Sequence, residues 1–268
     1  LLAASLLGAA GIQYAINGFS ALACLWQFPL LTAGMLAGLV LLFLLVLFVS
    51  TLFVDPKKLV EKPSAYFRFM LNQFCRLALF LGGVHVHITG LEKVPRKSRS
   101  MLISNHAFAF DPLIYYYAMP WADLAFLAKK ESFSIFVVAQ IMREVLCLPL
   151  DRENDRAAAK TIIEASRLLK SGKVSVGLFP EGYTSKTCEL LPFRNGAFKV
   201  AYRAEAPIAV CVINNTRSIP KELFWRRTEI KLNVLEVIPY EDYKDMHTVE
   251  LGDKIHDMML SELEKLRA

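Results

Sequence analysis

Residues 101–112 read Met-Leu-Ile-Ser-Asn-His-Ala-Phe-Ala-Phe-Asp-Pro, which is the pattern of a strand that passes through a turn into a helix. The short apolar run over residues 101–104 predicts a strand. Pro112 keeps Asp111 out of the helical region and suits the first position of a helix. Asp111 is therefore the expected N-cap of a helix that continues over residues 113–117.

Apolar and alternating runs on both sides of this unit predict further strands. Together with the first, the expected strands cover residues 84–89, 101–104, 124–128, 145–150, 173–179, 208–213 and 229–237. Apolar residues recur at helical spacing from Ala158 to Leu169, after Asn154 or Asp155 as N-cap, and again over residues 255–266. Strands that alternate with helices predict an α/β fold with a mixed, largely parallel sheet flanked by helices.

The start of the chain has a different composition. No Asp, Glu, Lys, Arg or His occurs before Asp55, although the whole chain is 54% hydrophobic with a mean hydropathy of +0.37. Residues 30–54 are uncharged and almost entirely apolar, and at about 1.5 Å per residue they cover the roughly 30 Å core of a bilayer. Whether residues 1–28 form a second membrane helix stays open. Residues 1–54 are thus expected to be a helical membrane anchor.

Basic residues follow this anchor directly. They are Lys57, Lys58, Lys62 and Arg68. Such a cluster favours the cytoplasmic side, so the rest of the chain is expected on the cytoplasmic face of the membrane. Residues 55–83 are expected to form an interfacial helical segment, in which Arg68 and Arg76 reach the membrane surface. A helix of the core is the alternative for this segment.

Charge and cysteine content exclude several classes of protein. The net charge is +6, but no Arg/Lys run with interleaved aromatic residues occurs, so anionic lipids or an anionic substrate explain the charge better than nucleic acid does. Five scattered cysteines lack any Cys-x-x-Cys spacing, which argues against a zinc site and a disulfide framework. They are Cys24, Cys75, Cys147, Cys188 and Cys211. We expect no metal.

His106 is the first candidate for chemistry, because it lies in the predicted turn five residues before Asp111. A turn that folds back onto the start of the helix brings the two side chains together. Asp111 then accepts a hydrogen bond from one ring nitrogen, which fixes the tautomer and leaves the other nitrogen free as a base. The alternative is that Asp111 only caps its helix and His106 is only a turn residue. No other histidine has a carboxylate at this spacing in such a turn.

The second candidate is the junction over residues 176–182, where a strand enters Pro180, Glu181 and Gly182. Proline ends the ladder of a strand, and glycine lets the backbone approach a ligand closely. A carboxylate here is suited to hold a glycerol-like hydroxyl, and the backbone N–H beside Gly182 is suited to hold an oxyanion. An ordinary turn is the alternative.

Taken together, Asn-His-x4-Asp and Phe-Pro-Glu-Gly about seventy residues later resemble the glycerolipid acyltransferase family, most closely the lysophosphatidic acid acyltransferases. The resemblance covers roughly residues 64–240, within an expected acyltransferase domain over residues 84–268. Three shorter blocks extend it. They are residues 126–131 with Lys129, residues 148–152 with Arg152, and residues 206–208.

The resemblance implies a direct acyl transfer without a cofactor. His106 takes the proton from a hydroxyl of the acceptor, which attacks the thioester of acyl-CoA or acyl carrier protein. Asp111 orients His106, donors near Gly182 stabilise the oxyanion, and Glu181 positions the glycerol. The implied acceptor is a membrane lysophospholipid, 1-acyl-sn-glycerol-3-phosphate, and the product is phosphatidic acid. Lys129 and Arg152 are implied contacts of the phosphate.

Two positions depart from the family pattern. Thr184 stands where the family usually has an arginine that meets the phosphate, and Val210 replaces a proline. Lys186 and Arg194 are candidate substitutes for the arginine. An acceptor with another head group is one alternative, and a catalytically weak, membrane-tethered lipid-binding or scaffold protein is another. A metal-dependent phosphoesterase lacks the additional clustered ligands that such a site requires.

Overall fold

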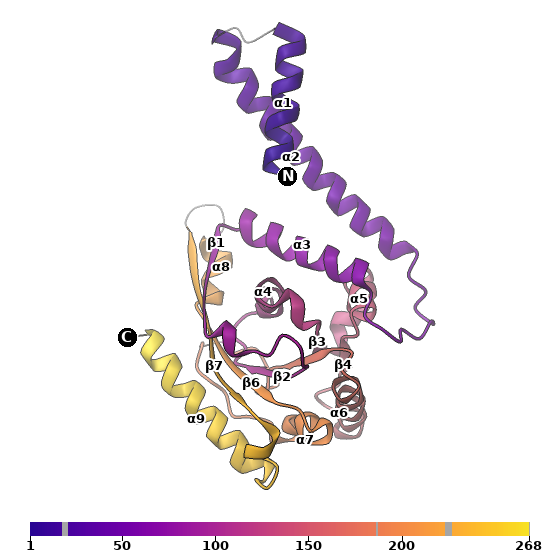
Figure 1. Ribbon diagram of the computed structural model, residues 1–268, viewed down its shortest axis with the longest axis vertical. Coiled ribbons are helices and arrows are strands. Elements are labelled where there is room, and N and C mark those ends of the chain that lie inside the picture. Colours follow the sequence, from indigo (N-terminus) through magenta and orange to yellow (C-terminus); the bar gives the residue numbers. More distant parts are fainter. Residues whose placement is uncertain (18–20, 186, 223–226, 268) are drawn as a thin grey trace. The chain divides into compact units, whose positions relative to one another are not determined.

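The computed structural model describes residues 1–17, 21–185, 187–222 and 227–267, and the chain divides into two compact units, Leu1–Asp55 and Pro56–Ala268. The first unit contains the helices α1 (Leu2–Asn17) and α2 (Ala21–Leu52), which pack against each other (Figure 1). Buried Gln13 donates a hydrogen bond from Nε2 to Oε1 of Gln27 over 3.4 Å. This bond satisfies polar groups between two otherwise apolar helices.

The stretch Trp26–Leu52 of α2 is the one helical segment among the described residues that is long and apolar enough to cross a membrane. It begins before the expected span of residues 30–54 and ends two residues earlier. Pro29 lies inside α2, so the helix continues through the position where the sequence suggested a start. The apolar stretch Leu2–Ile16 of α1 is helical too, but it is shorter than the roughly 20 residues of a typical span.

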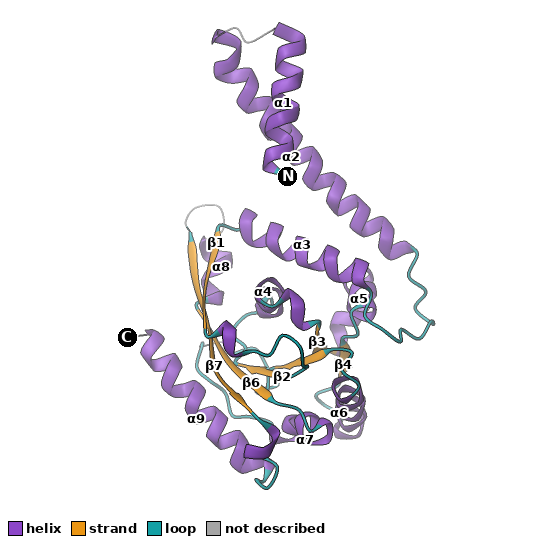
Figure 2. Ribbon diagram, in the orientation of Figure 1, coloured by secondary structure: helices purple, strands orange, loops and turns teal. Residues whose placement is uncertain are grey.

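A single sheet organises the second unit, as Figure 2 shows. Its strands, within the described residues, are β1 (Val84–Thr89), β2 (Met101–Ser104), β3 (Leu124–Lys129), β4 (Leu148–Leu150), β5 (Ser175–Leu178), β6 (Ile208–Asn214) and β7 (Thr228–Ile238). Their order is β1-β7-β6-β2-β5-β3-β4, and neighbours are parallel except β6 and β7. The predicted mixed, largely parallel sheet flanked by helices is confirmed.

Most strand boundaries agree with the sequence pattern to within two residues, but β4 is shorter than expected. The pattern predicted a strand over residues 145–150, whereas the structure begins it at Leu148. The amide of Val145 bonds to the carbonyl of Ile141, and that of Leu146 bonds to Arg143. The apolar run therefore starts by completing the preceding helix, which periodicity alone does not reveal.

Helices cover both faces of the sheet (Figures 1 and 2). On one face lie α3 (Ala65–Leu81), α4 (Asp111–Ala118) and α5 (Phe136–Glu144), and on the other lie α6 (Asp155–Lys170), α7 (Lys199–Ala204) and α9 (Thr248–Arg267). The short helix α8 (Ile219–Glu222) follows β6. Single-turn 3-10 segments occupy Leu91–Lys93, Pro120–Ala122, Lys130–Ser134, Asn195–Phe198, Thr216–Ser218 and Tyr240–Asp242.

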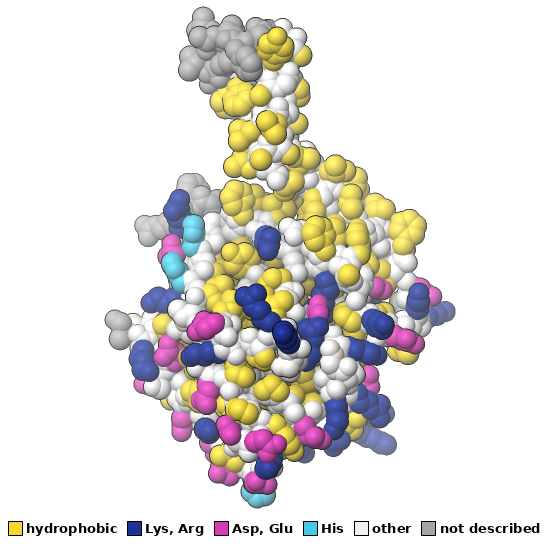
Figure 3. All heavy atoms as spheres, viewed as in Figure 1, with side chains coloured by type: hydrophobic (Ala, Val, Ile, Leu, Met, Phe, Trp, Pro, Cys, Tyr) yellow, Lys and Arg dark blue, Asp and Glu magenta, His cyan; other side chains and the backbone are white. Residues whose placement is uncertain are grey.

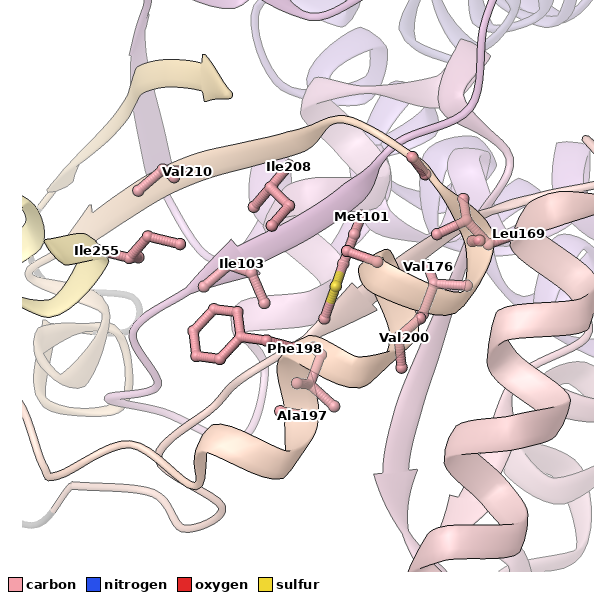
Figure 4. Packing of buried hydrophobic residues seen from close by; sticks show 14 of the residues in the cluster. Met101, Ile103, Leu169, Val176, Ala197, Phe198, Val200, Ile208, Val210 and Ile255 are labelled. Carbon is pink, nitrogen blue, oxygen red and sulfur yellow. The ribbon is translucent and has the colours of Figure 1, made fainter. Parts of the chain in front are cut away.

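The main core lies between the sheet and the second group of helices. Figure 4 shows Met101 and Ile103 of β2 directed toward Phe198, with Ile255 of α9 nearby; all four are fully buried. The α6 helix begins as expected, because the Asn154 side chain accepts a hydrogen bond from the amide of residue 157 over 3.0 Å. Packing on this face fixes the positions of the strand ends that carry the site.

Arg68 corrects one expectation about α3. The sequence placed it at the membrane surface, but its side chain is buried and donates to the carbonyls of Asp123, Leu124 and Val145. These carbonyls lie at the start of β3 and before β4, so the guanidinium satisfies backbone acceptors that would otherwise be buried without partners. Arg76 on the same helix is exposed. Only one face of α3 is therefore packed, and Arg68 belongs to that face.

Candidate active site

The turn between β2 and α4 brings His106 and Asp111 together. Oδ2 of Asp111, which is fully buried, accepts hydrogen bonds from Nδ1 of His106 over 2.9 Å and from the amides of Ala107 and Phe108 over 2.8 and 2.9 Å. The expected contact is confirmed. The expected cap is wrong, because Asp111 is the first residue of α4 and its oxygen faces the preceding turn instead of the helix amides.

The tautomer of His106 follows from this contact. Because a carboxylate can only accept, Nδ1 carries the proton and Nε2 keeps its lone pair. Within the described residues, Nε2 makes no hydrogen bond. The His106 side chain is only 10% exposed. Nε2 is therefore available to take a proton from a bound substrate.

Two aromatic rings stack in a column against the imidazole of His106. The His106 ring stacks on Phe179 with centroids 4.3 Å apart, and Phe179 stacks on Phe126 of β3 at 5.6 Å. Gly177 of β5 makes room for this column, since a Cβ there would lie 2.4 Å from the Phe126 ring. The orientation of the base thus depends on packing as well as on Asp111.

Glu181 holds the backbone of the same turn. Its Oε1 accepts from the amide of His106 over 2.6 Å, and its Oε2 accepts from the amide of Leu191 over 2.9 Å. The His106 carbonyl in turn accepts from the amide of Ser185 over 2.8 Å. Both oxygens of the expected glycerol-binding carboxylate are thus bonded to the main chain. Sequence reasoning missed this role, although a carboxylate directly after a buried strand was an available signal.

Asn105 is a second residue whose role the sequence did not reveal. Its Nδ2 donates to the carbonyl of Ile213 over 2.9 Å, and its Oδ1 accepts from the amide of the same residue over 2.8 Å. These two hydrogen bonds therefore hold the turn that contains His106 against the end of β6. The only sequence signal was the position of Asn105 beside His106.

Gly182 differs from its expected role. It has a φ of +75°, and a Cβ there would lie 2.9 Å from Nε of Arg194, so the close approach is made by this arginine. The Gly182 amide donates to the carbonyl of Phe179 over 3.2 Å and is not open to an oxyanion. The amide of Tyr183 makes no hydrogen bond within the described residues, which leaves it as the available donor beside Gly182.

Arg152 and Arg194 lie together next to this loop. Arg194 donates to the backbone carbonyl of Arg152 over 2.9 Å, and the two guanidinium groups stand 5.1 Å (Arg194) and 5.7 Å (Arg152) from the ring centre of Tyr183. Burial lowers the pKa of Arg152 from its ordinary value. Both arginines line a cavity of about 550 Å³ that Phe179 and Gly182 border and that continues along apolar residues of α6, among them Ala158 and Ile162. A phosphate with an apolar tail fits this combination.

The remaining predicted cations are placed differently. Lys129 is exposed at the end of β3, lies 3.7 Å from Glu131 and does not line the cavity. Its neighbour Lys130 pairs with Asp151 over 2.8 Å. Lys186 lies outside the described residues. Within them, no group of three or more His, Cys, Asp or Glu side chains is arranged to hold a metal ion.

Glu181 gives the site a pH dependence, because burial raises its pKa from the ordinary value of 4.5 to about 7. The folded state then binds this proton more tightly than the unfolded state, so its contribution to stability is present below pH 4.5 and is lost as the pH rises to about 7. Glu181→Gln removes the ionisation. We expect the difference in Tm, variant minus wild type, to increase between pH 4.5 and about pH 7 and to stay constant above it.

Melting in detergent micelles at pH 5 to 8 measures this difference. Glu264→Gln, at an exposed position of α9, is the matched control and should show no such trend. A Tm difference between Glu181→Gln and wild type that is constant over the range would contradict the prediction.

Known proteins share this fold and these segments. The Acyltransferase family model matches residues 85–214. A 1-acyl-sn-glycerol-3-phosphate acyltransferase of Borreliella burgdorferi is 26% identical over 200 residues, covering 74% of this chain and 79% of the relative. One of the same name from Limnanthes douglasii is 27% identical over 194 residues, covering 70% and 66%.

Among solved structures, the crystal structure of PlsC, the 1-acyl-sn-glycerophosphate acyltransferase of Thermotoga maritima, matches with a TM-score of 0.64. The match covers 100% of this chain and 98% of that one at 22% identity, which shows a common fold. The matched segment 85–214 contains the His106 turn, Glu181 and both arginines. Residues 85–214 are therefore similar to the acyltransferase family of enzymes.

Proposed function

We propose that this protein transfers a fatty acyl group from an acyl thioester to the free hydroxyl of 1-acyl-sn-glycerol-3-phosphate, which gives phosphatidic acid. The donor is acyl-CoA or acyl carrier protein. The observation that carries the proposal is the His106–Asp111 pair, with Nε2 unbonded, whose ring stacks on Phe179 at the border of a cavity that has an apolar wall and is lined by Arg152 and Arg194 among other cations. The names of the relatives support the choice of acceptor.

The reaction needs one base and no covalent intermediate on the protein. Nε2 of His106 takes the proton of the acceptor hydroxyl while its oxygen attacks the thioester carbonyl carbon. The tetrahedral intermediate then collapses, the carbon–sulfur bond breaks, and the leaving thiolate takes the proton back from the imidazolium. Asp111 stabilises the imidazolium through its contact with Nδ1. The Tyr183 amide is the proposed donor to the oxyanion.

Three of the described cysteines offer no competing nucleophile. Cys75, Cys147 and Cys211 are buried, and burial raises the pKa of each thiol above its ordinary value. Because the thiolate is the reactive form, these groups stay unreactive at neutral pH. This supports direct transfer from the donor to the acceptor.

The phosphate of the acceptor is assigned to Arg152 and Arg194. Both border the cavity, and no carboxylate forms a salt bridge with either of them within the described residues. Lys129 already has Glu131 near it and is exposed, which screens its charge. We therefore assign to Arg194 the role of the family arginine that Thr184 replaces. Lys129 then contributes less to phosphate binding than the sequence suggested.

Membrane lipids are the proposed surroundings of this site. The stretch Trp26–Leu52 is apolar enough to span a bilayer, and Lys57, Lys58 and Lys62 after it favour the cytoplasmic face for the catalytic unit. Figure 3 shows hydrophobic side chains gathered over the α3 region of that unit, where Phe69 is 59% exposed. We expect the protein to stay in the membrane pellet after alkaline carbonate extraction. Release into the supernatant would reject a spanning anchor.

The catalytic pair has a direct test. His106→Ala should lower kcat at least about 100-fold with the fold intact, because general base catalysis contributes about 10²–10⁴-fold. Asp111→Asn should also lower kcat strongly, since its amide group opposes donors at Oδ2. Acyl transfer by purified protein measures both. His247→Ala, at an exposed position of the C-terminal segment, is the control and should keep native activity. Native turnover by His106→Ala would refute the mechanism.

The phosphate assignment makes a separate prediction. Arg152→Ala and Arg194→Ala should each raise KM for lysophosphatidic acid by roughly 10- to 150-fold, because losing a charge-assisted contact costs about 1.5–3 kcal/mol. The KM for uncharged monoacylglycerol should barely change. Lys129→Ala is the control at an exposed cation, with a smaller effect, and Thr184→Arg should preserve or improve use of the phosphate substrate. Equal native rates on both acceptors, unchanged by either arginine variant, would reject a phosphate acceptor.

A further inference from the structure

A second cavity, of about 430 Å³, borders the other side of the catalytic turn. Asn105 and Ala107, the two neighbours of His106, line it together with residues at the end of β6. The first cavity is bordered by Gly182 and by Phe179, whose ring stacks on that of His106. The two cavities therefore border different neighbours of His106, and a transfer between two substrates requires two binding sites near one base.

The lining of this second cavity is positively charged. Its described lining residues include three cations and no Asp or Glu. The cations are Arg217, Lys221 and Arg267. Arg217 donates to the carbonyl of Ser185 over 3.0 Å and Arg267 donates to the carbonyl of Cys188, so the two guanidinium groups also hold the adjacent wall. Arg267 meets a neutral carbonyl there and Lys221 adds a second positive charge, so this lining attracts an anion.

The two cavities differ in polarity. The first has apolar walls from α6 and suits the chain of a lipid. The second is lined mainly by polar groups, among them the side chains of Thr187, Asn214 and Asn215. Both thioester carriers of the proposed reaction, coenzyme A and the acyl carrier protein, hold the acyl group on a phosphopantetheine arm, which is polar and carries phosphate.

We propose that the second cavity binds the phosphate of the donor's phosphopantetheine arm, which rests on the proposed function for the identity of the donor. The arm then delivers the thioester carbonyl to His106 from the Asn105 side, while the acceptor approaches from the Gly182 side. Asn105 is bonded to Ile213, so the wall of the donor site and the catalytic turn form one fixed piece. Lys221, exposed at the rim, is the cation with the greatest freedom to meet the phosphate.

Direct binding of coenzyme A to the full chain in detergent micelles tests the proposal without turnover. Lys221→Ala should weaken binding at least about threefold, and Lys221→Glu at least about tenfold, because the substitution replaces attraction by repulsion of the phosphate. Both effects should shrink as salt is raised. Lys254→Glu is the matched control: it makes the same charge change on α9, at an exposed position that does not line the cavity, and should bind like wild type.

Three probes separate the sources of the phosphate. If Lys221→Glu weakens the binding of 4′-phosphopantetheine as much as that of coenzyme A, the cavity binds the phosphate that both carriers share. If Lys221→Glu weakens the binding of coenzyme A but not that of 4′-phosphopantetheine, the cavity binds the nucleotide phosphates of coenzyme A. That result would make coenzyme A the donor and would overturn the assignment to the shared arm. Equal affinity of wild type and Lys221→Glu for both probes, or an equal loss with phosphate-free pantetheine, overturns the proposal altogether.

Steady-state kinetics then separate this proposal from the assignment of the acceptor. Lys221→Glu should raise KM for the acyl donor and leave KM for lysophosphatidic acid within about twofold of wild type. The opposite pattern would assign the cavity to the acceptor and reject the donor site. A wild-type protein that binds coenzyme A through Lys221 but does not acylate lysophosphatidic acid would overturn the proposed acceptor and leave the donor site standing.

Discussion

One carboxylate oxygen, Oδ2 of Asp111, determines the shape of the catalytic turn. It is fully buried and accepts three hydrogen bonds, one from the His106 ring and two from successive backbone amides. A buried charge is costly unless donors surround it, and these donors come from the turn itself. The turn therefore has to close around Asp111 for the carboxylate to be buried, and closing it sets the ring of His106. Oδ1 has no hydrogen bond within the described residues, which keeps negative charge available to an imidazolium.

The sheet supplies the rest of the site through its parallel strands. The segments after β2, β5 and β6 leave the same edge of the sheet and supply His106, Glu181 and the wall of the second cavity. Each of these segments is tied to the turn by a polar contact, through Glu181, Ser185 or Asn105. Ligands of open α/β sheets bind at the carboxyl ends of strands, and this protein uses three adjacent ends for one base.

The sequence was most informative where a signal is local. Buried strands are short apolar runs between turns, so their positions could be predicted, and the spacing of His106 and Asp111 in a turn predicted their contact. Arg68 shows why other features could not be predicted. An arginine on an apolar helix gives the same sequence pattern whether its side chain reaches water or buried carbonyls. The carbonyls that bind Arg68 belong to residues more than fifty positions away in the sequence. Glu181 and Asn105 are similar, because their partners are backbone groups, which leave no trace in the sequence.

The ring column of Phe126, Phe179 and His106 links the rigidity of the core to the working base. Its innermost ring lies against Gly177 in the middle of the sheet, and its outermost ring is the imidazole of His106. Interiors pack densely and pass small displacements from one side chain to the next. A displacement that loosens the contact between β3 and β5 is therefore passed to the His106 ring through packed side chains. Thermal inactivation is therefore expected to accompany the melting of the sheet and not to precede it.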